Sequence, residues 1–404
     1  MHILYLHQHF ATPQGSTGTR SYEFSRRWIE AGHKVTLITG YYDVGGLELG
    51  RGLIQKQTID EINVIIVGTE YSNKQSYLKR IISFLCFILF SIYTGLRTKG
   101  VDVMYATSTP LTVGIPAVVL KWLKHIPFIF EVRDQWPEVP IGLGIIKNKV
   151  IIGILVWLEK TIYKQSEAII TLSPGMAEGI RTVLKEKKTV TVIPNSSDTE
   201  IFRPGVDGSA VRKRYGWEDR LVLLHAGAMG KVNSLDFVID AADRLKETPQ
   251  ILFVLLGEGS QKPALQSRVK KLNLTNVEIL PCVSKKQLPE VFAAADVGLV
   301  IIGNYPIVEH NSANKFFDSL STGKPVLLNY SGWQRELLEK NEIGFGCDLY
   351  NLDEFVEKVL YLNSNRDKLT IMGQNARRLA VEQFDRDKSA GQALAQIELV
   401  LGKE

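Results

Sequence analysis

The sequence predicts an α/β protein made of two Rossmann-like, doubly wound domains. Its 404 residues are 45% hydrophobic, which is enough for two cores, since a single core rarely grows beyond about 250 to 300 residues. Short apolar runs alternate with segments of helical periodicity, and this alternation pauses near residues 195–210 and then restarts. We expect a first domain at 1–200, a second at 201–380 and a terminal helical segment at 381–404.

The first domain begins with a strand, a glycine-bearing loop, a helix and a second strand. "MHILYL" supplies the first strand, while Phe24, Trp28 and Ile29 recur at helical spacing. "HKVTLITG" is β-branched and apolar, as a buried parallel strand should be. Further runs of the same kind predict a mostly parallel sheet: "VDVMYATS", "IPFIFEVRD", "AIITLSPGM" and "TVTVIPNSS".

The second domain repeats this pattern after a linker marked by Pro204 and Gly205. Its expected strands are "RLVLLHAGAM", "ILFVLLGEG", "VEILPCV", "VGLVII" and "KPVLLN". Ligands of open parallel sheets bind beyond the carboxyl ends of the strands, and two such domains that face each other form a cleft. We therefore expect the functional residues at the strand ends.

Composition excludes several classes of protein. Three scattered cysteines give neither a disulfide framework nor a zinc site, and "MHILYLHQHF" lacks the features of a cleavable signal, so we expect a cytoplasmic protein. The net charge of +5 falls entirely in residues 1–200, with 22 Lys and Arg against 17 Asp and Glu. No aromatic and basic nucleic-acid motif accompanies it, so nucleic acid is not an expected partner.

Two apolar segments with basic ends carry that charge. "LKRIISFLCFILFSIYTGLR" holds sixteen uncharged residues from 81 to 96, and "KNKVIIGILVWLEKTIYK" has lysines at both ends. A spanning helix needs about 20 apolar residues. We interpret both as helices on an anionic membrane surface; the alternative is core helices of an α/β domain.

Two strand ends of the first domain carry candidate site residues. Gly15 and Gly18 form a loop whose backbone amides suit an anion, although a plain tight turn is equally consistent and the spacing is not the Gly-x-Gly-x-x-Gly dinucleotide motif. In "EVRDQWPEVP", Asp134 and Glu138 suit proton abstraction from an acceptor hydroxyl, or else a salt bridge or helix cap. Trp136 suits a wall for a sugar ring or core packing.

The second domain has two further glycine-rich loops at strand ends. Gly227 and Gly230 precede Lys231, a point charge for phosphate. The next strand ends in Gly257, Glu258 and Gly259, which permit close approach of a base or ribose. Either loop alone has a structural explanation.

The segment "VEHNSANKFFDSLSTGKPVLLN" at 308–329 predicts a helix that begins between Ser312 and Asn314. Lys315 then lies in the first turn, with Asp318 three residues further along the same face. Helix-end amides and Lys315 suit a pyrophosphate, and Asp318 suits a ribose diol. The alternative is a surface ion pair between these two side chains.

These motifs resemble the family-4 glycosyltransferases of GT-B fold over essentially the whole chain. The resemblance rests on "SPGM", "VIPNSSDTEIFRP", "HAGAMGK", "LGEG" and "NKFFDSLSTGKPVL" in this order. "RDQWPE" looks like the branch that adds N-acetylated, often deoxy, amino sugars such as N-acetylfucosamine to lipid-linked precursors of O-antigen or capsule.

The resemblance implies a retaining transferase that uses a UDP-sugar, without a metal or other cofactor, at the cytoplasmic face of the bacterial inner membrane. The second domain would hold the donor, the first a polyprenyl-diphosphate saccharide, and the terminal helix would cross back to the first. The family's Glu-x7-Glu element falls on His310 and Asp318, so the usual sugar-contacting glutamate is replaced. Ala228 stands near an expected arginine.

The resulting assignment covers three groups of residues. We expect Asp134, Lys231 and Lys315 in catalysis; Gly18, Gly227, Gly230, Gly257, Glu258, Gly259, His310, Asn314 and Asp318 at the donor; and His9, Arg20, Trp136 and Glu138 at the acceptor. Two alternatives remain: a UDP-N-acetylamino-sugar 2-epimerase of the same architecture, and a non-catalytic transferase-like subunit.

Overall fold

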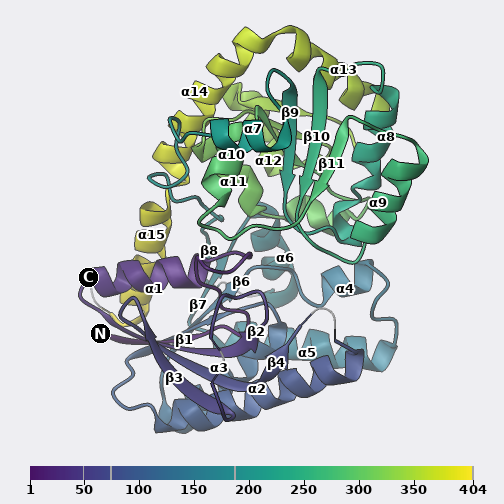
Figure 1. Cartoon of the computed structure of the whole chain (residues 1–404). Coiled ribbons are helices and arrows are strands. Elements are labelled where there is room, and N and C mark those ends of the chain that lie inside the picture. Colours follow the sequence, from purple (N-terminus) through teal and green to yellow (C-terminus); the bar gives the residue numbers. More distant parts are fainter. Residues whose placement is uncertain (49, 73–74, 186–187, 403–404) are drawn as a thin grey trace. The chain divides into compact units, whose positions relative to one another are not determined.

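The computed structural model describes residues 1–48, 50–72, 75–185 and 188–402 of the chain (Figure 1). The chain divides into two compact units. Unit 1 consists of Met1–Pro194 and Asp387–Glu404, and unit 2 consists of Asn195–Arg386. Of the expected terminal segment at 381–404, the part from Asp387 groups with unit 1, whereas residues 381–386 group with unit 2.

Unit 1 contains, within its described residues, an eight-stranded sheet in the order β3-β4-β2-β1-β5-β6-β7-β8. All neighbouring pairs are parallel except β3 with β4. The central strands are buried along their whole length, which explains their continuous apolar runs. The strands are β1 (His2–Leu6), β2 (Lys34–Tyr42), β3 (Ile54–Ile59), β4 (Ile62–Tyr71), β5 (Val103–Thr107), β6 (Phe128–Val132), β7 (Ala168–Thr171) and β8 (Val190–Val192).

Helices cover both faces of this sheet. The helices are α1 (Arg20–Glu30), α2 (Tyr77–Arg97), α3 (Gly114–Lys124), α4 (Glu138–Gly142), α5 (Lys149–Gln165), α6 (Pro174–Leu184) and α15 (Arg386–Val400), with a 3-10 turn, η1 (Leu111–Val113). α1 and α15 share one core, in which the indole of Trp28 donates to the carbonyl of Ala390 at 3.0 Å. α2, α3, α5 and α6 share the core on the opposite face.

The C-terminal carbonyls of α2 and α5 are bound by lysines from other elements. The Lys124 ammonium donates to the carbonyls of Gly95 and Thr98 at 3.3 and 2.5 Å. Lys188 donates to three carbonyls at the end of α5, including those of Tyr163 and Lys164. Charged donors at this end of a helix also complement its dipole. The C-terminal ends of α2 and α5 are therefore hydrogen-bonded to other parts of unit 1.

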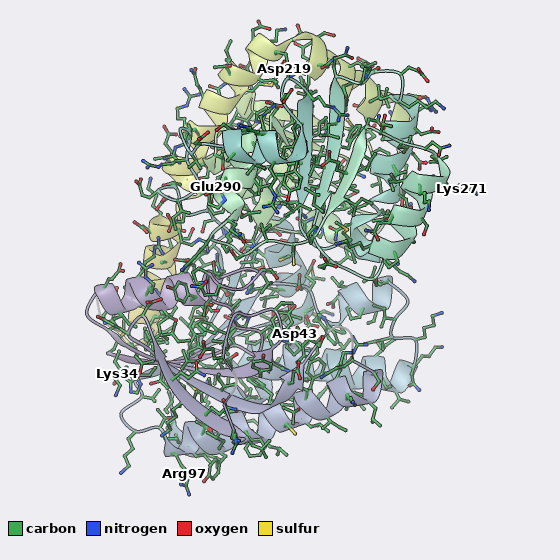
Figure 2. The ribbon with its side chains drawn as sticks, viewed as in Figure 1. Lys34, Asp43, Arg97, Asp219, Lys271 and Glu290 are labelled. Carbon is green, nitrogen blue, oxygen red and sulfur yellow. The ribbon has the colours of Figure 1, made fainter. Side chains whose placement is uncertain are left out.

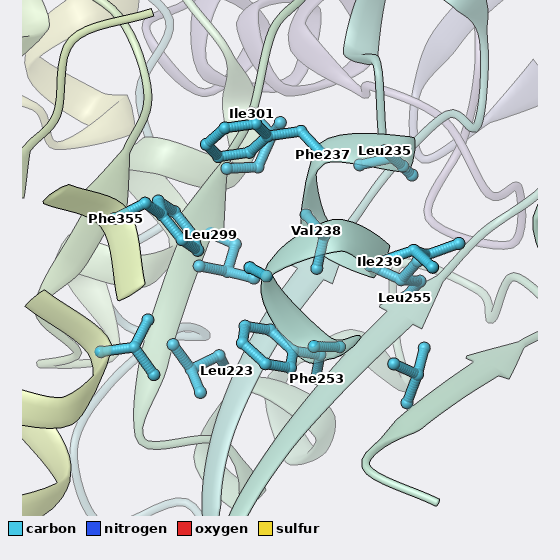
Figure 3. Packing of buried hydrophobic residues seen from close by; sticks show 14 of the residues in the cluster. Leu223, Leu235, Phe237, Val238, Ile239, Phe253, Leu255, Leu299, Ile301 and Phe355 are labelled. Atoms are coloured by element: carbon cyan, nitrogen blue, oxygen red, sulfur yellow. The ribbon is translucent and has the colours of Figure 1, made fainter. Parts of the chain in front are cut away.

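Unit 2 contains a six-stranded parallel sheet in the order β11-β10-β9-β12-β13-β14 among its described residues. Hydrophobic side chains of β9, β10 and β12 pack against α8 (Asp236–Arg244) and α13 (Leu352–Ser364), as Figure 3 shows for Leu223, Phe253 and Leu299 on the strands and Phe355 on α13. The strands are β9 (Leu221–Ala226), β10 (Ile251–Leu256), β11 (Val277–Leu280), β12 (Val297–Val300), β13 (Val326–Leu328) and β14 (Gly344–Gly346).

The remaining elements of unit 2 are helical. They are α7 (Ser209–Tyr215), η2 (Lys231–Asn233), α8 (Asp236–Arg244), α9 (Lys262–Lys271), α10 (Leu288–Ala294), η3 (Pro306–His310), α11 (Asn314–Ser321), α12 (Trp333–Asn341), α13 (Leu352–Ser364) and α14 (Arg366–Gln383). α11 begins at Asn314, inside the range expected from the sequence.

Candidate functional site

In unit 2, the loops that follow β9 and β10 pack backbone against backbone. The amide of Met229 donates to the carbonyl of Glu258 at 2.8 Å, and the amide of Gln261 donates back to the carbonyl of Met229 at 2.9 Å. A Cβ atom on Gly257 would lie 1.9 Å from the carbonyl oxygen of Gly227, and one on Gly259 would lie 2.4 Å from that of Met229. Glycine is required at 257 and 259 because the loops approach so closely.

Lys315 extends from the first turn of α11 to the loop after β9. A Cβ atom on Gly227 would lie 2.8 Å from Cε and 3.2 Å from Nζ of Lys315. No carboxylate among the described residues forms an ion pair with this ammonium. Burial lowers the pKa of Lys315 from 10.5 to about 8. The site therefore presents a desolvated cation that protein carboxylates do not neutralise.

His225 lies beneath the same loop. It is fully buried in β9, and its Nε2 would be 3.6 Å from a Cβ atom on Gly227. Burial, and then the charge of Lys315, lower the pKa of His225 well below its usual value. The imidazole is neutral, so Lys315 is the cation at this position.

Asp318 differs from the sequence expectation. It neither pairs with Lys315 nor stands free beside it: its side chain is 2% exposed and accepts from Ser197 Oγ at 2.8 Å and from Lys285 Nζ at 2.6 Å. Lys285 also lies 4.4 Å from the ring centre of Phe202. Lys315 and Asp318 thus have different neighbours. A ribose contact by Asp318 remains a prediction, and it requires a ribose hydroxyl to replace Ser197 or Lys285 as its partner.

The other predicted donor residues differ in exposure and in their contacts. Lys231 is exposed at the start of η2, and Glu258 is exposed and pairs with Lys262 at 2.6 Å. A Cβ atom on Gly230 would have no neighbour within 4 Å. His310 ends η3, four residues before Asn314 opens α11. Their contacts with a donor remain predictions.

In unit 1, Arg20 has a structural position, contrary to its predicted place at the acceptor. Its guanidinium is 2% exposed and donates to Glu131 Oε1 at 2.9 Å and to the carbonyls of Ile193 and Pro194 at 3.0 and 2.8 Å. Glu131 also accepts from the hydroxyls of Tyr105 and Thr107. Because every guanidinium nitrogen donates a hydrogen bond within the protein, Arg20 links the chain after β8, at Ile193 and Pro194, to Glu131 in the sheet.

The "RDQWPE" turn after β6 divides into an exposed part and a buried part. Asp134 is exposed and accepts from Thr109 Oγ1 at 2.6 Å, while Trp136 packs partly against the core. Burial raises the pKa of Glu138. Glu159 of α5 is 2% exposed, and burial together with the charge of Glu138 raises its pKa to about 8.

The first loop packs against the turn at 44–46. The amide of Ser16 donates to the carbonyl of Val44 at 3.1 Å, and a Cβ atom on Gly15 would lie 2.6 Å from that carbonyl oxygen. Gly18 is partly exposed one residue before the N-cap of α1, Thr19. His9 follows β1, and its ring contacts those of Tyr42 and Tyr71. The predicted anion contact of Gly18 stays a prediction.

The sequence interpretation missed Glu131, Glu159, Ser197, Lys285 and His225. Glu131 and Glu159 carry a detectable signal, because each is a carboxylate inside an apolar run, "FIFEV" and "LVWLEK". Lys285 and Ser197 reach Asp318 only through the tertiary fold.

Metal ligands do not gather in the described residues: no group of three or more His, Cys, Asp or Glu side chains there could hold an ion. Asp385 and Asp387, an Asp-x-Asp pair near the start of α15, are also engaged by protein groups. Asp385 accepts from Thr199 Oγ1 at 2.5 Å, and Asp387 pairs with Arg27.

The fold and this loop-and-helix site define a class, the GT-B proteins, in which two Rossmann-like domains carry the binding groups at their strand ends. Solved structures agree on the fold. A sucrose-phosphate synthase from Thermosynechococcus elongatus matches with a TM-score of 0.79 and 14% identity over 99% of both chains. Anabaena HepE in complex with UDP-glucose matches with a TM-score of 0.71 and 17% identity over 98% of this chain and 99% of that one.

Family models then identify the two halves. Residues 15–196 match the glycosyl transferase 4-like domain, and residues 209–379 match the glycosyl transferases group 1 domain. The chain belongs to the GT-B glycosyltransferases that combine these two domains.

Curated relatives match over shorter segments. WcaI of Escherichia coli K12, named for glycosyl transfer in colanic acid biosynthesis, is 25% identical over 43% of this chain and 44% of its own. The N-acetyl-alpha-D-glucosaminyl L-malate synthase of Bacillus anthracis is 20% identical over 57% of this chain and 58% of its own. The chain therefore spans about half the length of these relatives.

Proposed function

We propose that the protein transfers a sugar from a UDP-sugar to a lipid-linked saccharide during synthesis of a cell-surface polysaccharide, at the cytoplasmic face of the inner membrane. The proposed donor carries an N-acetylamino sugar such as N-acetylfucosamine. The proposed acceptor is a polyprenyl-diphosphate saccharide, and the proposed outcome at the anomeric carbon is retention.

The observation that carries the donor assignment is the unneutralised Lys315 ammonium against Gly227. A diphosphate supplies the missing negative charge, and the amides at the start of α11 supply further donors. Lys231, exposed on the same loop, adds a second cation. The UDP and UDP-glucose bound by HepE support a nucleotide sugar as the ligand of such a domain.

The chemistry follows from where charge develops. The bond from C1 of the sugar to the diphosphate oxygen breaks, and a bond from C1 to an acceptor hydroxyl oxygen forms. In a retaining reaction the acceptor approaches from the face that the diphosphate leaves, so its proton passes to the departing phosphate oxygen. Lys315 and Lys231 stabilise the departing charge. Asp134, exposed in unit 1, orients the acceptor hydroxyl.

The membrane assignment rests on an apolar surface of unit 1, which we call the apolar face. It consists of exposed side chains on α2, α3 and α5 and in the turn before α5: Leu78, Ile81, Ile82, Leu85, Leu89, Trp122, Leu123, Ile145, Val150, Ile151, Ile154 and Trp157. Leu85 and Trp157 are 54% and 66% exposed. Exposed apolar areas of this extent mark interaction surfaces.

Exposed basic side chains lie close in sequence to residues of the apolar face, among them Lys79, Lys147, Lys149 and Lys160. This combination suits adsorption to an anionic leaflet. Within the described residues one helix, Leu78–Arg97, is long and apolar enough to cross a membrane. Its inner side packs along β4 and buries Phe87, so we propose that it lies on the membrane surface.

The decisive experiment measures UDP release. Purified protein is incubated with a panel of UDP-sugars, with and without a synthetic polyprenyl-diphosphate monosaccharide, in EDTA and in Mg²⁺. We expect acceptor-dependent UDP release from one donor in both buffers. Isomerisation of the donor without an acceptor would indicate an epimerase instead, and UDP binding without turnover would indicate a non-catalytic subunit.

Sedimentation with vesicles tests the membrane assignment separately. Wild-type protein should sediment with vesicles that contain phosphatidylglycerol, and the double variant Leu85→Ser, Trp157→Ser should lose most of this binding. Ile371→Ser is the matched control, because Ile371 is 58% exposed on α14 in unit 2. Equal binding of the double variant and the control would contradict the assignment.

A further inference from the structure

An aromatic cluster lies at the C-terminal edge of the sheet of unit 1. It consists of His9, Tyr42, Tyr71 and Phe84, and we call it the aromatic cluster. The His9 ring centre lies 4.5 Å from that of Tyr71, 5.1 Å from that of Tyr42 and 6.5 Å from that of Phe84. Tyr71 stacks on Phe84 at 5.4 Å with an interplanar angle of 22°. All four side chains are partly exposed.

The sheet places these rings together. Tyr42 and Tyr71 are the last residues of β2 and β4, and they are partners in the parallel register. His9 follows β1, which neighbours β2, so three adjacent strands each present one ring beyond their carboxyl ends. This edge is where open parallel sheets bind their ligands.

A short hydrogen bond holds the two strand ends in place. Asp43, labelled in Figure 2, follows Tyr42, and its Oδ2 accepts from Oγ of Ser72, the residue after Tyr71, at 2.6 Å. Asp43 is exposed, so its carboxylate stands at the rim of the aromatic cluster. The rings are therefore positioned by backbone pairing and by this bond, and packing among themselves adds to both.

His9 adds polar capacity within the aromatic cluster. Its Nδ1 is buried and makes no hydrogen bond to the described residues. Burial, and then the charge of Arg133, lower the pKa of His9 to about 4, so the ring is neutral near pH 7. A neutral imidazole offers one donor and one acceptor, which suits a hydroxyl group. Aromatic faces with a few polar atoms are typical of small-ligand sites.

The helix that completes the aromatic cluster also carries the apolar face. Phe84 lies on the inner side of α2, while Ile81 and Leu85, its neighbours in the same turn, are exposed on the outer side. A lipid held on the outer side and a sugar ring held on the inner side would be separated by the width of one helix, about 10 Å.

We propose that the aromatic cluster binds a sugar ring of the lipid-linked acceptor, with Tyr71 and Phe84 as stacking surfaces and His9 as a hydrogen-bonding group. The inference rests on the proposed function and names a binding site for its acceptor. Asp43 accepts from a hydroxyl of the same ring at the rim.

The test compares two soluble probes on the full-length protein without donor: farnesyl diphosphate that carries N-acetylglucosamine, and farnesyl diphosphate alone. Titration calorimetry gives both affinities. Wild-type protein should bind the sugar-bearing probe more tightly. Tyr71→Ala should weaken binding of that probe about tenfold, which corresponds to about 1.4 kcal/mol, because it removes an aromatic stacking surface. Binding of the sugar-free probe should stay within about twofold.

Two further variants keep the result interpretable. His9→Phe retains a ring and removes both nitrogens, so it should weaken only the sugar-bearing probe. Tyr93→Ala is the matched control, because Tyr93 is 45% exposed on α2 and packs against Arg97 instead. Equal losses for the two probes, or no loss, in both Tyr71→Ala and His9→Phe would overturn the inference.

Failure of the proposed function has a different signature. UDP affinity, measured on the same samples, depends on unit 2 and should not change in these variants. If the wild-type protein binds no UDP, the proposed transfer from a UDP-sugar fails, whatever the probes show. If UDP binds and the wild-type protein does not distinguish the two probes, the aromatic cluster is not the sugar site.

Discussion

Raising the pH from 7 to 9 should weaken UDP binding through Lys315. With a pKa of about 8, about nine-tenths of this side chain is charged at pH 7 and about one-tenth at pH 9. The terminal phosphate of UDP, with a second pKa of about 6, is already about nine-tenths ionised at pH 7 and gains little further charge by pH 9. If binding requires the ammonium, the dissociation constant should rise about tenfold, which corresponds to about 1.4 kcal/mol.

Titration calorimetry of UDP at three pH values measures this effect, and Lys315→Arg is the control. A guanidinium stays charged throughout, so the variant should show weaker but pH-independent binding. The stability of the unliganded protein should change in the opposite direction. The pKa of Lys315 is lowered in the folded state, whereas the unfolded chain holds this proton up to about pH 10. The free energy of unfolding should therefore rise between pH 8 and 10. A wild-type UDP affinity that does not change with pH, or the same change with pH in Lys315→Arg, would refute the reasoning.

Three further predictions concern single positions. Gly227→Ala should displace Lys315 and weaken UDP binding about tenfold in calorimetry, whereas Gly230→Ala, whose new methyl group meets open space, should not; equal effects would exclude a steric cause. Arg20→Met should lower the free energy of unfolding by about 3 to 5 kcal/mol in urea, because it leaves a buried carboxylate unpaired; loss of acceptor binding at unchanged stability would restore its predicted acceptor role. Glu159→Gln should raise the melting temperature at pH 8 and leave it nearly unchanged at pH 4. The reason is that the raised pKa of Glu159 makes the stability of the wild type fall as pH rises from about 4.5 to 8. A shift of the melting temperature of equal size at both pH values would contradict this.

Strand-end positions were accessible from the sequence because apolar runs and glycines report directly on a parallel sheet. The start of α11 and the glycine loops after β9 and β10 follow from local pattern and backbone sterics. The proximity of Lys315 to Gly227 was not predictable, because Gly227 follows β9 whereas Lys315 lies in α11, and the contact depends on how far the lysine side chain reaches.

Buried polar partners limited the remaining predictions. Spacing along a helix placed Asp318 beside Lys315, but the side chain pairs with Lys285, which comes from a loop 33 residues earlier. Arg20 stands next to an anion-binding type of loop, and only the fold shows that Glu131, 111 residues away, engages it. Sequence periodicity reports which residues face inward and does not report which inward charges meet.

The lysines that bind the ends of α2 and α5 bear on the proposed adsorption of unit 1 to a lipid surface. Bare carbonyls at a helix end must find water or another donor, which penalises transfer into an apolar medium. Here Lys124 and Lys188 satisfy them from within the same unit. If unit 1 adsorbs to a lipid surface as proposed, attachment and release would involve side chains and leave both helix ends hydrogen-bonded, so the protein should remain folded through release.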